Sequence, residues 1–394
     1  MSFLMPDPRC LVPASPLILA LESSCDETAA AVVRAGNTVL SNVIASQHDL
    51  HAEYAGVVPE IASRAHVERL LPVLRRALTD ANITYTDLAA IAVGHRPGLI
   101  GSLLVGVSAA KALAWSLNIP ILGIDHVQAH LYAGLLDRAA DSLDNVFPAL
   151  GLVVSGGHTS LYLLDSPLKL RRLGSTIDDA VGEAYDKAAV ILGLPFPGGP
   201  HLDKLAQSGN DRAFDFPLSR LAPDSLDFSF SGLKTATLYT VRGVPQAPSS
   251  APSPSGRGQG EGYSPSVSSS PSSSPSFRSS VPRSALPPDR YPDVAASFQR
   301  AAINALLLKV RRALDLHSDI RSLLIGGGVS ANSRLRTEFT TLARERNLRL
   351  FLPPMPYCLD NAAMIAGLAW HRFINNDFDD LALSAHPSSS LASA

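Results

Sequence analysis

The chain is poor in cysteine, in aromatic residues and in net charge. Only three cysteines, Cys10, Cys25 and Cys358, are spread over its 394 residues, and no two of them have C-x-x-C spacing. An odd, scattered set argues against the disulfide framework typical of small secreted proteins. The formal net charge is −2. Without a strongly basic field, any contact with nucleic acid must depend on a local patch or on partner proteins.

Long apolar runs are missing as well. A membrane-spanning helix needs about 20 apolar residues, whereas the apolar stretch 98–110 is short and ends at Lys111. We expect this stretch to form a buried helix. The opening MSFLMPDPRC does not show the basic and then apolar order of a signal peptide. These observations predict a cytoplasmic protein without a membrane segment.

Three stretches have compositions that oppose folding. Residues 1–16 are rich in proline and are expected to form a loose extension. Residues 243–289 are dominated by Ser, Pro and Gly, so they cannot bury enough apolar area to offset the entropy of ordering, and we expect a disordered insertion. Residues 380–394 form a Ser/Ala-rich stretch that we expect to be a flexible tail.

The remaining sequence alternates strand-like and helix-like patterns, which predicts an α/β fold. The stretch 18–33 reads as strand, small polar turn, strand, and the stretch 150–164 repeats this arrangement. The repetition favours a duplicated fold. A helix is predicted to begin at Pro59, and another to span 103–117 between short strands at 91–93 and 121–124.

Three turns rich in small residues recur in this order. They are Ser23 to Asp26, Ser155 to His158, and the three glycines 326–328 that lead toward a helix. Small residues let backbone N–H groups approach a phosphate or carboxylate closely. Each turn alone is weak support, because such turns are common. Together, in this order, they indicate a site for a nucleotide-like ligand.

Two histidines four residues apart, His126 and His130, would lie on one face of a helix and could share an ion. The spacing equally allows two ordinary histidines, one capping and one buried. Val127 stands where a zinc protease motif needs Glu. Asp360 is a candidate third ligand, with a plain N-cap as the alternative. Two His and one carboxylate suit Fe(II) and are compatible with Zn(II), while Cys358 is a much weaker ligand candidate.

The acidic stretch from Asp178 to Lys187 is predicted to be helical, with Asp179, Glu183 and Asp186 on neighbouring faces. Its carboxylates either form a solvated face offset by Lys187 or bind sugar hydroxyls. Asp203, after a Pro-Gly-Gly-Pro turn, could join them.

Taken together, these stretches closely resemble the TsaD/Gcp family of tRNA threonylcarbamoyladenosine synthesis, once labelled O-sialoglycoprotein endopeptidases. The matching pieces run in order from about residue 18 to 372 and leave only the low-complexity insertion unmatched. They are ESSCDETAAAVV, VVPEIASRAH, RPGLIGSLLVG, HVQAH, VVSGGHTSL, DDAVGEAYDKAA, PFPGGP, FSFSGLKTA, AASFQRAA, GGGVSAN and CLDNAAMIAG.

The resemblance implies a two-lobed actin-like or sugar-kinase-like (ASKHA) α/β fold. The first lobe would span 17–125 and include the C-terminal helix 360–375, and the second would span 126–359. It also implies transfer of a threonylcarbamoyl group from threonylcarbamoyl-AMP to N6 of adenosine-37, with release of AMP, in tRNAs that read codons starting with A. The implied partners are a TsaB-like paralogous subunit and a TsaE-like ATPase.

The resemblance assigns the metal, expected to be Fe(II) with Zn(II) as the alternative, to His126, His130 and Asp360. Glu27 matches the acid of the SCDET turn and is expected to contribute to the chemistry. The implied substrate-binding residues are Val153, Val154, Ser155, Gly156, Gly157, Asp186, Gly199, Asp203 and Asn332. Lys234 lies in a shared segment, but its role is less defined.

The sequence departs from the family pattern at two places. Gln128 stands where Glu is common, and His95-Arg96 replaces a smaller, Gly-containing approach to Pro97. Three rival functions remain open on the residues: an ATPase or kinase on the same scaffold, an inactive scaffolding paralogue, and a protease. The three metal-binding residues argue against the scaffold, and the missing Glu argues against the protease.

Overall fold

The computed structural model describes residues 15–54, 56–219, 221–222, 224–243, 285–389 and 391. Nearly all of the predicted extension 1–16 lies outside these residues, as does the predicted insertion from 244 to 284. The final part of that insertion is ordered, contrary to expectation. The Leu286 amide donates to the Val241 carbonyl at 2.8 Å, and a 3-10 helix spans Pro288–Arg290.

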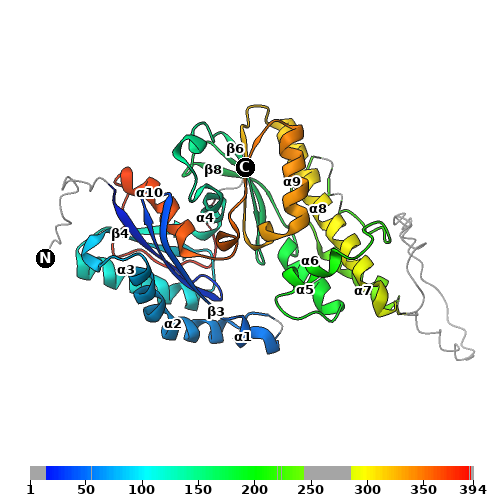
Figure 1. Ribbon diagram of the computed structural model, residues 1–394, viewed down its shortest axis with the longest axis horizontal. Helices are drawn as coiled ribbons and strands as arrows, with labels where there is room; N and C mark the ends of the chain where they lie inside the picture. Colours follow the sequence, from blue (N-terminus) through cyan, green and yellow to red (C-terminus); the bar gives the residue numbers. More distant parts are fainter. Residues whose placement is uncertain are drawn as a thin grey trace, which may run out of the picture.

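The ten strands form two five-stranded mixed sheets (Figure 1). The strands of the first sheet are β1 Leu17–Glu22, β2 Glu27–Arg34, β3 Thr38–Ser46, β4 Leu88–Arg96 and β5 Ile121–Asp125. Those of the second sheet are β6 Ala149–Val154, β7 Thr159–Leu164, β8 Leu170–Ser175, β9 Ser322–Gly326 and β10 Arg349–Phe351.

The two sheets have the same topology, which confirms the duplication. Their strand orders are β3-β2-β1-β4-β5 and β8-β7-β6-β9-β10. In each sheet the first three strands pair antiparallel, and the first, fourth and fifth pair parallel. Each hairpin that the sequence predicted therefore opens one repeat.

Ten α-helices complete the described chain. They are α1 His48–His51, α2 Pro59–Asp80, α3 Ile100–Leu117, α4 His126–Tyr132, α5 Val181–Ile191, α6 Gly198–Ala206, α7 Ser231–Arg242, α8 Tyr291–Leu316, α9 Ser333–Glu345 and α10 Ala362–Ile374. The equivalent helices of the two repeats include α3 and α9, which follow the fourth strand, and α4 and α10, which follow the fifth. Pro59 begins α2 as predicted, at a position where proline costs no hydrogen bond.

Period-2 alternation along the strands creates three apolar layers. In β1, Leu19 and Leu21 face α2 and α3, whereas Ile18 and Ala20 face α10. The second sheet is covered on its outer face by α5 to α9. The middle layer, built on α4 and α10, is shared by both sheets (Figure 1). The two central helices are thus covered by a sheet on either side.

Helix α3 is 18 residues long and, by length and composition alone, apolar enough to cross a membrane. It packs on β4 and α2 in the described part of the chain, with Leu103, Gly106 and Ala110 on its buried face. The prediction of a buried helix is only half right, because Leu104 and Trp115 are 51% and 67% exposed.

The predicted flexible tail is also corrected over much of its length. From Asp379 to Ser389 the chain lies against the first lobe. Asp379 bridges Ile121 of β5, the His386 amide donates to the His95 carbonyl at 2.9 Å, and Ser389 donates to Asp125 at 2.6 Å. Residues 390 and 392–394 lie outside the described chain.

Candidate metal centre and substrate site

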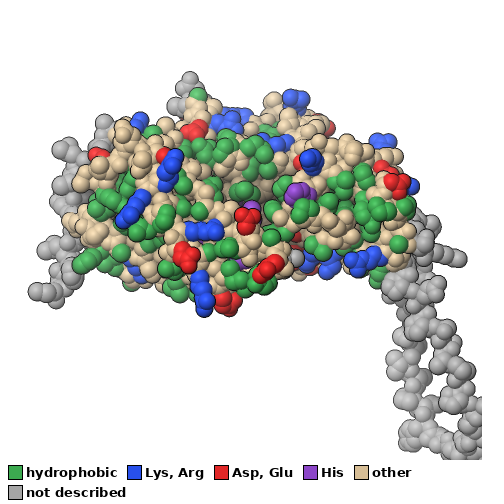
Figure 2. Space-filling view, turned by 60° about the horizontal axis from the view of Figure 1, so that its bottom comes forward, with side chains coloured by type: hydrophobic (Ala, Val, Ile, Leu, Met, Phe, Trp, Pro, Cys, Tyr) green, Lys and Arg blue, Asp and Glu red, His purple; other side chains and the backbone are tan. Residues whose placement is uncertain are grey.

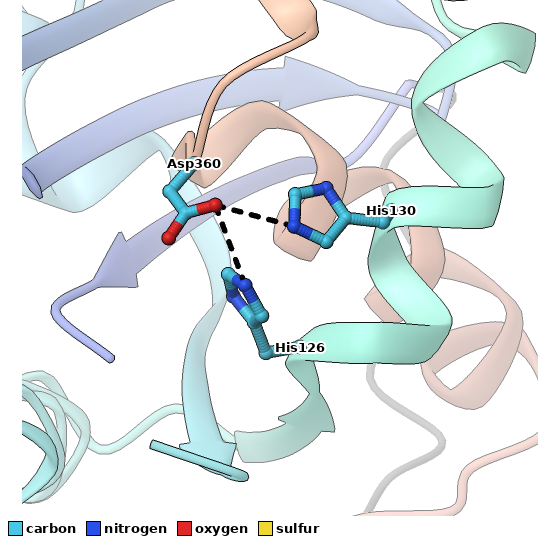
Figure 3. A group of neighbouring side chains, drawn as sticks. All are labelled: His126, His130 and Asp360. Carbon is cyan, nitrogen blue, oxygen red and sulfur yellow. Dashed lines mark ion pairs between the residues drawn. The ribbon is translucent and has the colours of Figure 1, made fainter. Parts of the chain in front are cut away.

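The two central helices bring His126, His130 and Asp360 together (Figure 3). Nε2 of His126 lies 3.5 Å from Oδ1 of Asp360, and Nε2 of His130 lies 3.2 Å from the same oxygen. Two ligands held about 2.1 Å from one ion stand about 3.0–3.4 Å apart in octahedral or tetrahedral geometry. The side chains are therefore spaced to share a divalent ion.

The local sequence explains this placement. Asp125 ends β5 and caps α4, because its Oδ1 accepts from the amides of Val127 and Gln128 at 3.0 and 3.2 Å. This fixes the direction of the helix that carries both histidines. Asp360 is not an N-cap, since Asn361 caps α10 through the Met364 amide at 3.0 Å. The carboxylate of Asp360 is left free to face the histidines.

Close backbone packing holds His130 in place. Gly326, at the end of β9, lies so near α4 that an added Cβ would collide with the His130 carbonyl. Nδ1 of this fully buried histidine lacks a hydrogen-bond partner among the described residues, and Nε2 has only the ion-pair contact with Asp360. A buried polar group without a partner is costly. A bound metal ion would satisfy Nε2, so the donor set fits a metal.

The electrostatics of the three side chains also fit a cation. Burial opposes ionisation of Asp360, but the two histidines hold its pKa well below its usual range. Burial and the neighbouring His126 lower the pKa of His130. Burial would lower the pKa of His126, but Asp360 and Glu22 raise it well above its usual value. Ionised carboxylate and neutral imidazole are the metal-binding forms, so a metal would displace a proton from His126.

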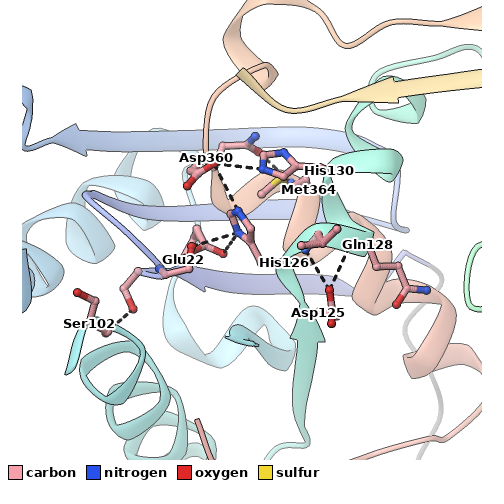
Figure 4. A network of polar contacts seen from close by, with 12 residues as sticks. Glu22, Ser102, Asp125, His126, Gln128, His130, Asp360 and Met364 are labelled. Atoms are coloured by element: carbon pink, nitrogen blue, oxygen red, sulfur yellow. Dashed lines mark hydrogen bonds and ion pairs between the residues drawn. The ribbon is translucent and has the colours of Figure 1, made fainter. Parts of the chain in front are cut away.

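The sequence analysis missed Glu22, the last residue of β1. Its fully buried carboxylate places Oε2 3.1 Å from Nδ1 of His126 (Figure 4), and Oε1 accepts from the Ser24 amide at 2.6 Å. A carboxylate on the far nitrogen orients a metal-binding histidine and raises its basicity. The only signal was a charged residue at the end of an apolar strand.

His158 was also missed as a neighbour of the centre. It follows the turn Ser155-Gly156-Gly157, and its amide donates to Oγ of Ser155 at 3.1 Å. Burial, with His126 and His130 nearby, lowers its pKa to about 4. The ring is therefore neutral at physiological pH and adds no positive charge beside the candidate metal centre.

The predicted substrate residues gather near the ends of β6 and β9. Val153 and Val154 end β6, and the following turn contacts the start of α5, where the Gly182 amide donates to the Ser155 carbonyl at 3.2 Å. A Cβ added at Gly156 or Gly157 would meet nothing within 4 Å. The turn therefore leaves open space beside its backbone amides. Parallel strands that end together form the usual ligand edge of such sheets.

Asp186, Gly199, Asp203 and Asn332 are held by internal hydrogen bonds. Asp186 accepts from the Gly198 amide at 2.8 Å at the start of α6, and burial raises its pKa despite the Gly198 and Gly199 amides. Asp203 accepts from Gln299 at 2.9 Å and from the Ser333 hydroxyl at 2.8 Å. Asn332 donates to Gln299 at 3.0 Å and caps α9.

The predicted acidic helix is partly wrong. Helix α5 begins at Val181, so Asp178 and Asp179 precede it. Asp178 accepts hydrogen bonds from Ser229 and Ser231 at 2.6 and 2.7 Å, which fixes the start of α7 that carries Lys234. Lys187 lies 2.6 Å from Asp179 and 2.8 Å from Glu183. Asp179 and Glu183 therefore form the face whose charge Lys187 offsets. Of the acidic residues in this stretch, only Asp186 turns toward the Pro-Gly-Gly-Pro turn.

The departures from the family pattern have structural partners. Gln128 donates to the Pro167 carbonyl at 2.8 Å, so its side chain is occupied away from the candidate metal centre (Figure 4). His95 lies 3.0 Å from the Ser384 carbonyl, and Arg96 lies 3.6 Å from Asp125. His95 and Arg96 thus connect the C-terminal segment to the residue that caps α4. Cys358 accepts from Arg336 at 3.3 Å, so its sulfur is occupied away from the metal-binding group.

These features define a two-lobed α/β protein of the ASKHA type with a candidate metal centre between its lobes. Two HypF structures share this fold. The T. kodakarensis protein aligns with a TM-score of 0.55 and 14% identity over 93% of this chain and 48% of its own. The other, nucleotide-bound structure aligns with a TM-score of 0.53 and 12% identity over 96% and 48%.

The chain belongs to the tRNA N6-adenosine threonylcarbamoyltransferase family, whose model matches residues 38–367. Curated relatives of that name match along nearly their whole length. The protein of Rhodopirellula baltica is 46% identical over 95% of this chain and 97% of its own. That of Moorella thermoacetica is 45% identical over 94% and 96%.

The contact between Glu22 and His126 predicts an effect on metal affinity. We expect Glu22→Gln to weaken Zn(II) binding by about 10–100-fold, because the amide orients His126 less firmly and lowers its basicity. Competition with a calibrated chelator measures the affinity. Glu60→Gln, on the exposed first turn of α2, is the matched control. Equal affinities for the two variants would show that Glu22 has no such role.

Burial of Glu27 predicts a pH-dependent stability. Burial raises the pKa of Glu27 to about 8, with Asp360 and Asp26 adding to the rise against the opposing His48. Since the unfolded chain ionises near 4.5, the folded protein loses stability from this group as pH rises from about 4.5 to 8. Metal-free Glu27→Gln should therefore gain thermal stability over wild type toward pH 9, and the gain should shrink toward pH 5. Exposed Glu68→Gln is the control, and a pH-independent difference would contradict the assignment.

Proposed function

We propose that this chain transfers a threonylcarbamoyl group from threonylcarbamoyl-AMP to N6 of adenosine-37 in tRNAs that read codons starting with A. The observation that carries the proposal is the group His126, His130 and Asp360, assembled next to two glycine-rich turns in a chain of this family. We propose the cytoplasm as the place of reaction.

The three metal-binding side chains would hold one divalent ion per chain, with Fe(II) favoured and Zn(II) as the alternative. When bound, such an ion would supply Lewis acidity that polarises the threonylcarbamoyl carbonyl. Glu22 would keep the His126 ring turned toward the ion, since its carboxylate occupies the far nitrogen.

The turn from Val153 to Gly157 would bind the phosphate of the donor through its backbone amides, because open space lies beside Gly156 and Gly157. Asp186 and Asp203 would accept hydrogen bonds from ribose hydroxyls. Both already accept hydrogen bonds from the protein, but a carboxylate offers about four acceptor sites. Gly199 and Asn332 would complete the pocket, with Asn332 acting through its network to Asp203.

Such an arrangement needs no covalent intermediate. The adenine amine is a weak nucleophile, and holding it against an activated carbonyl supplies much of the rate in reactions of this kind. The electron pair of the broken C–O bond would leave with AMP. Glu27, close enough to Asp360 for that charge to raise its pKa, would lie beside the same reacting group.

A direct assay tests the proposal. Purified protein with its partners would be mixed with threonylcarbamoyl-AMP and unmodified tRNA, and digested nucleosides would be measured by mass spectrometry. We expect product with wild type and at least about 100-fold less with His126→Ala or Asp360→Ala, because the ion contributes several kcal/mol to the transition state. His317→Ala, at the end of α8, is the control. Full activity of folded His126→Ala would overturn the metal role.

The partners we propose are a TsaB-like paralogous subunit and a TsaE-like ATPase, together with the tRNA. Helices α2 and α3 offer a surface for the paralogue. Val67 and Leu71 of α2 are exposed, as are Ile100, Leu104 and Trp115 of α3. Figure 2, turned to bring the α2 side forward, shows hydrophobic side chains on this face with charged side chains between them. Exposed apolar side chains gathered on one face and rimmed by polar residues are typical of a protein interface.

The patch predicts a charge-sensitive interface. Leu71→Asp and Leu104→Asp should each weaken binding of the paralogous subunit by at least about tenfold, because each would bury an unpaired charge. Analytical ultracentrifugation of the mixed subunits measures the affinity. Leu316→Asp, exposed at the far end of α8, is the control. Unchanged affinity for both variants would place the interface elsewhere.

A further inference from the structure

His48 lies where the two lobes meet, and the reaction proposed above gives it no role. Its Nε2 is 3.1 Å from Oε1 of Glu27 and 3.9 Å from Oδ2 of Asp26, both at the start of β2. Its ring stands edge-on to Phe196 of the second lobe, with centroids 6.1 Å apart. Phe196 directly precedes the Pro-Gly-Gly-Pro turn that begins α6. One side chain thus touches Glu27 on one lobe and the approach to the candidate ribose site on the other.

The surroundings of Glu27 oppose its ionisation, so its contact with His48 matters. Its carboxylate is almost completely buried, while His48 remains 31% exposed. The charged groups that act on Glu27 are Asp26, Asp360 and His48, and only His48 favours the ionised carboxylate. Cys25, the other titratable neighbour, has its pKa raised by burial and by these same carboxylates. Without His48, burial and two like charges would raise the pKa of Glu27 further.

The surroundings of His48 favour its protonated form. The hydrogen bond to Glu27 raises the pKa of His48 against the effect of its burial, and Asp26 and Asp49 raise it further. Its charge also reaches Asp186 on α5, where it favours the ionised carboxylate. The imidazole therefore sits among acidic groups from both lobes and is stabilised as a cation.

We propose that His48 is a positioning residue that holds Glu27 as the carboxylate which accepts the N6 proton of the target adenosine during transfer. This inference rests on the proposed function. As N6 attacks the carbamoyl carbon, the new C–N bond forms and the C–O bond to the AMP phosphate breaks, with its electron pair leaving on AMP. The N6 proton passes to Glu27, and the half-exposed His48 provides the route by which it reaches solvent.

A raised carboxylate pKa suits this task, since a base works best when its pKa lies near the operating pH. An ordinary glutamate would be ionised but too weakly basic, whereas Glu27 without a partner would be blocked by its own proton. His48 resolves this conflict because its hydrogen bond and charge both favour the carboxylate. The same three side chains, Asp26, Glu27 and His48, are also close enough to bind a cation, which is the competing use that the test must separate.

The test is the pH dependence of single-turnover transfer by His48→Gln, measured with the partner subunits, threonylcarbamoyl-AMP and tRNA. The variant keeps a hydrogen-bonding group but loses the charge. We expect the acid limb of the rate profile to move up by about one pH unit or more, so that the rate falls about tenfold at pH 7 and approaches wild type near pH 9. Apparent affinities for donor and tRNA should change less than twofold. His48→Asn provides a second variant, and His317→Gln is the control.

The outcomes separate this inference from the function itself. An inactive wild type would refute the proposed function. An active wild type with an unchanged profile in folded His48→Gln would overturn the role of His48. Metal analysis after loading with Zn(II) decides the remaining alternative. Two ions per wild-type chain and one per His48→Gln chain would also overturn the proposal, because the side chains would then form a second metal site.

Discussion

The shared middle layer is the constraint on which the rest of the structure depends. Helices α4 and α10 pack against each other and against opposite sheets, so neither lobe has a complete core without the helix that follows the other's last strand. Because the central helices begin near one another, residues 230 positions apart converge at their starts. Gly326 packs so closely on the His130 carbonyl that no side chain would fit between them, which shows how tightly this layer is packed. The geometry of the candidate metal centre is therefore a consequence of core packing.

Duplication explains why the functional groups come from equivalent places in the two repeats. The first hairpin of each repeat ends in a turn at the inner edge of its sheet, one with Asp26 and Glu27 and the other with Ser155 and Gly156. The helix after the last strand supplies the histidines in one repeat, and the approach to that helix supplies Asp360 in the other. Divergence at matching positions has thus given one lobe acidic and basic groups and the other an open, small-residue turn.

Much of this arrangement was predictable from local sequence, and the failures have physical causes. Hairpins, the start of α2 at Pro59 and the histidine pair depend on spacing along one element. Glu22 and His48 were missed because their partners lie 104 and 21 residues away, at His126 and Glu27. The tail was misjudged because composition alone cannot show that His386 bonds to His95 and Ser389 to Asp125. Asp178 was placed in a helix because its acidic spacing fits one, yet it serves the start of α7 instead.

The site also shows how a protein tolerates several buried acids in one place. Glu22 and Glu27 are buried and the Asp360 side chain is 19% exposed, in a region where isolated carboxylates would be costly. Each faces an imidazole: Glu22 faces His126, Asp360 faces His126 and His130, and Glu27 faces His48. Alternating acids with imidazoles keeps the net charge of this cluster low. A purely structural core would gain stability from apolar residues here, so alternating acids and imidazoles suit the proposed cation site better than a role in packing alone.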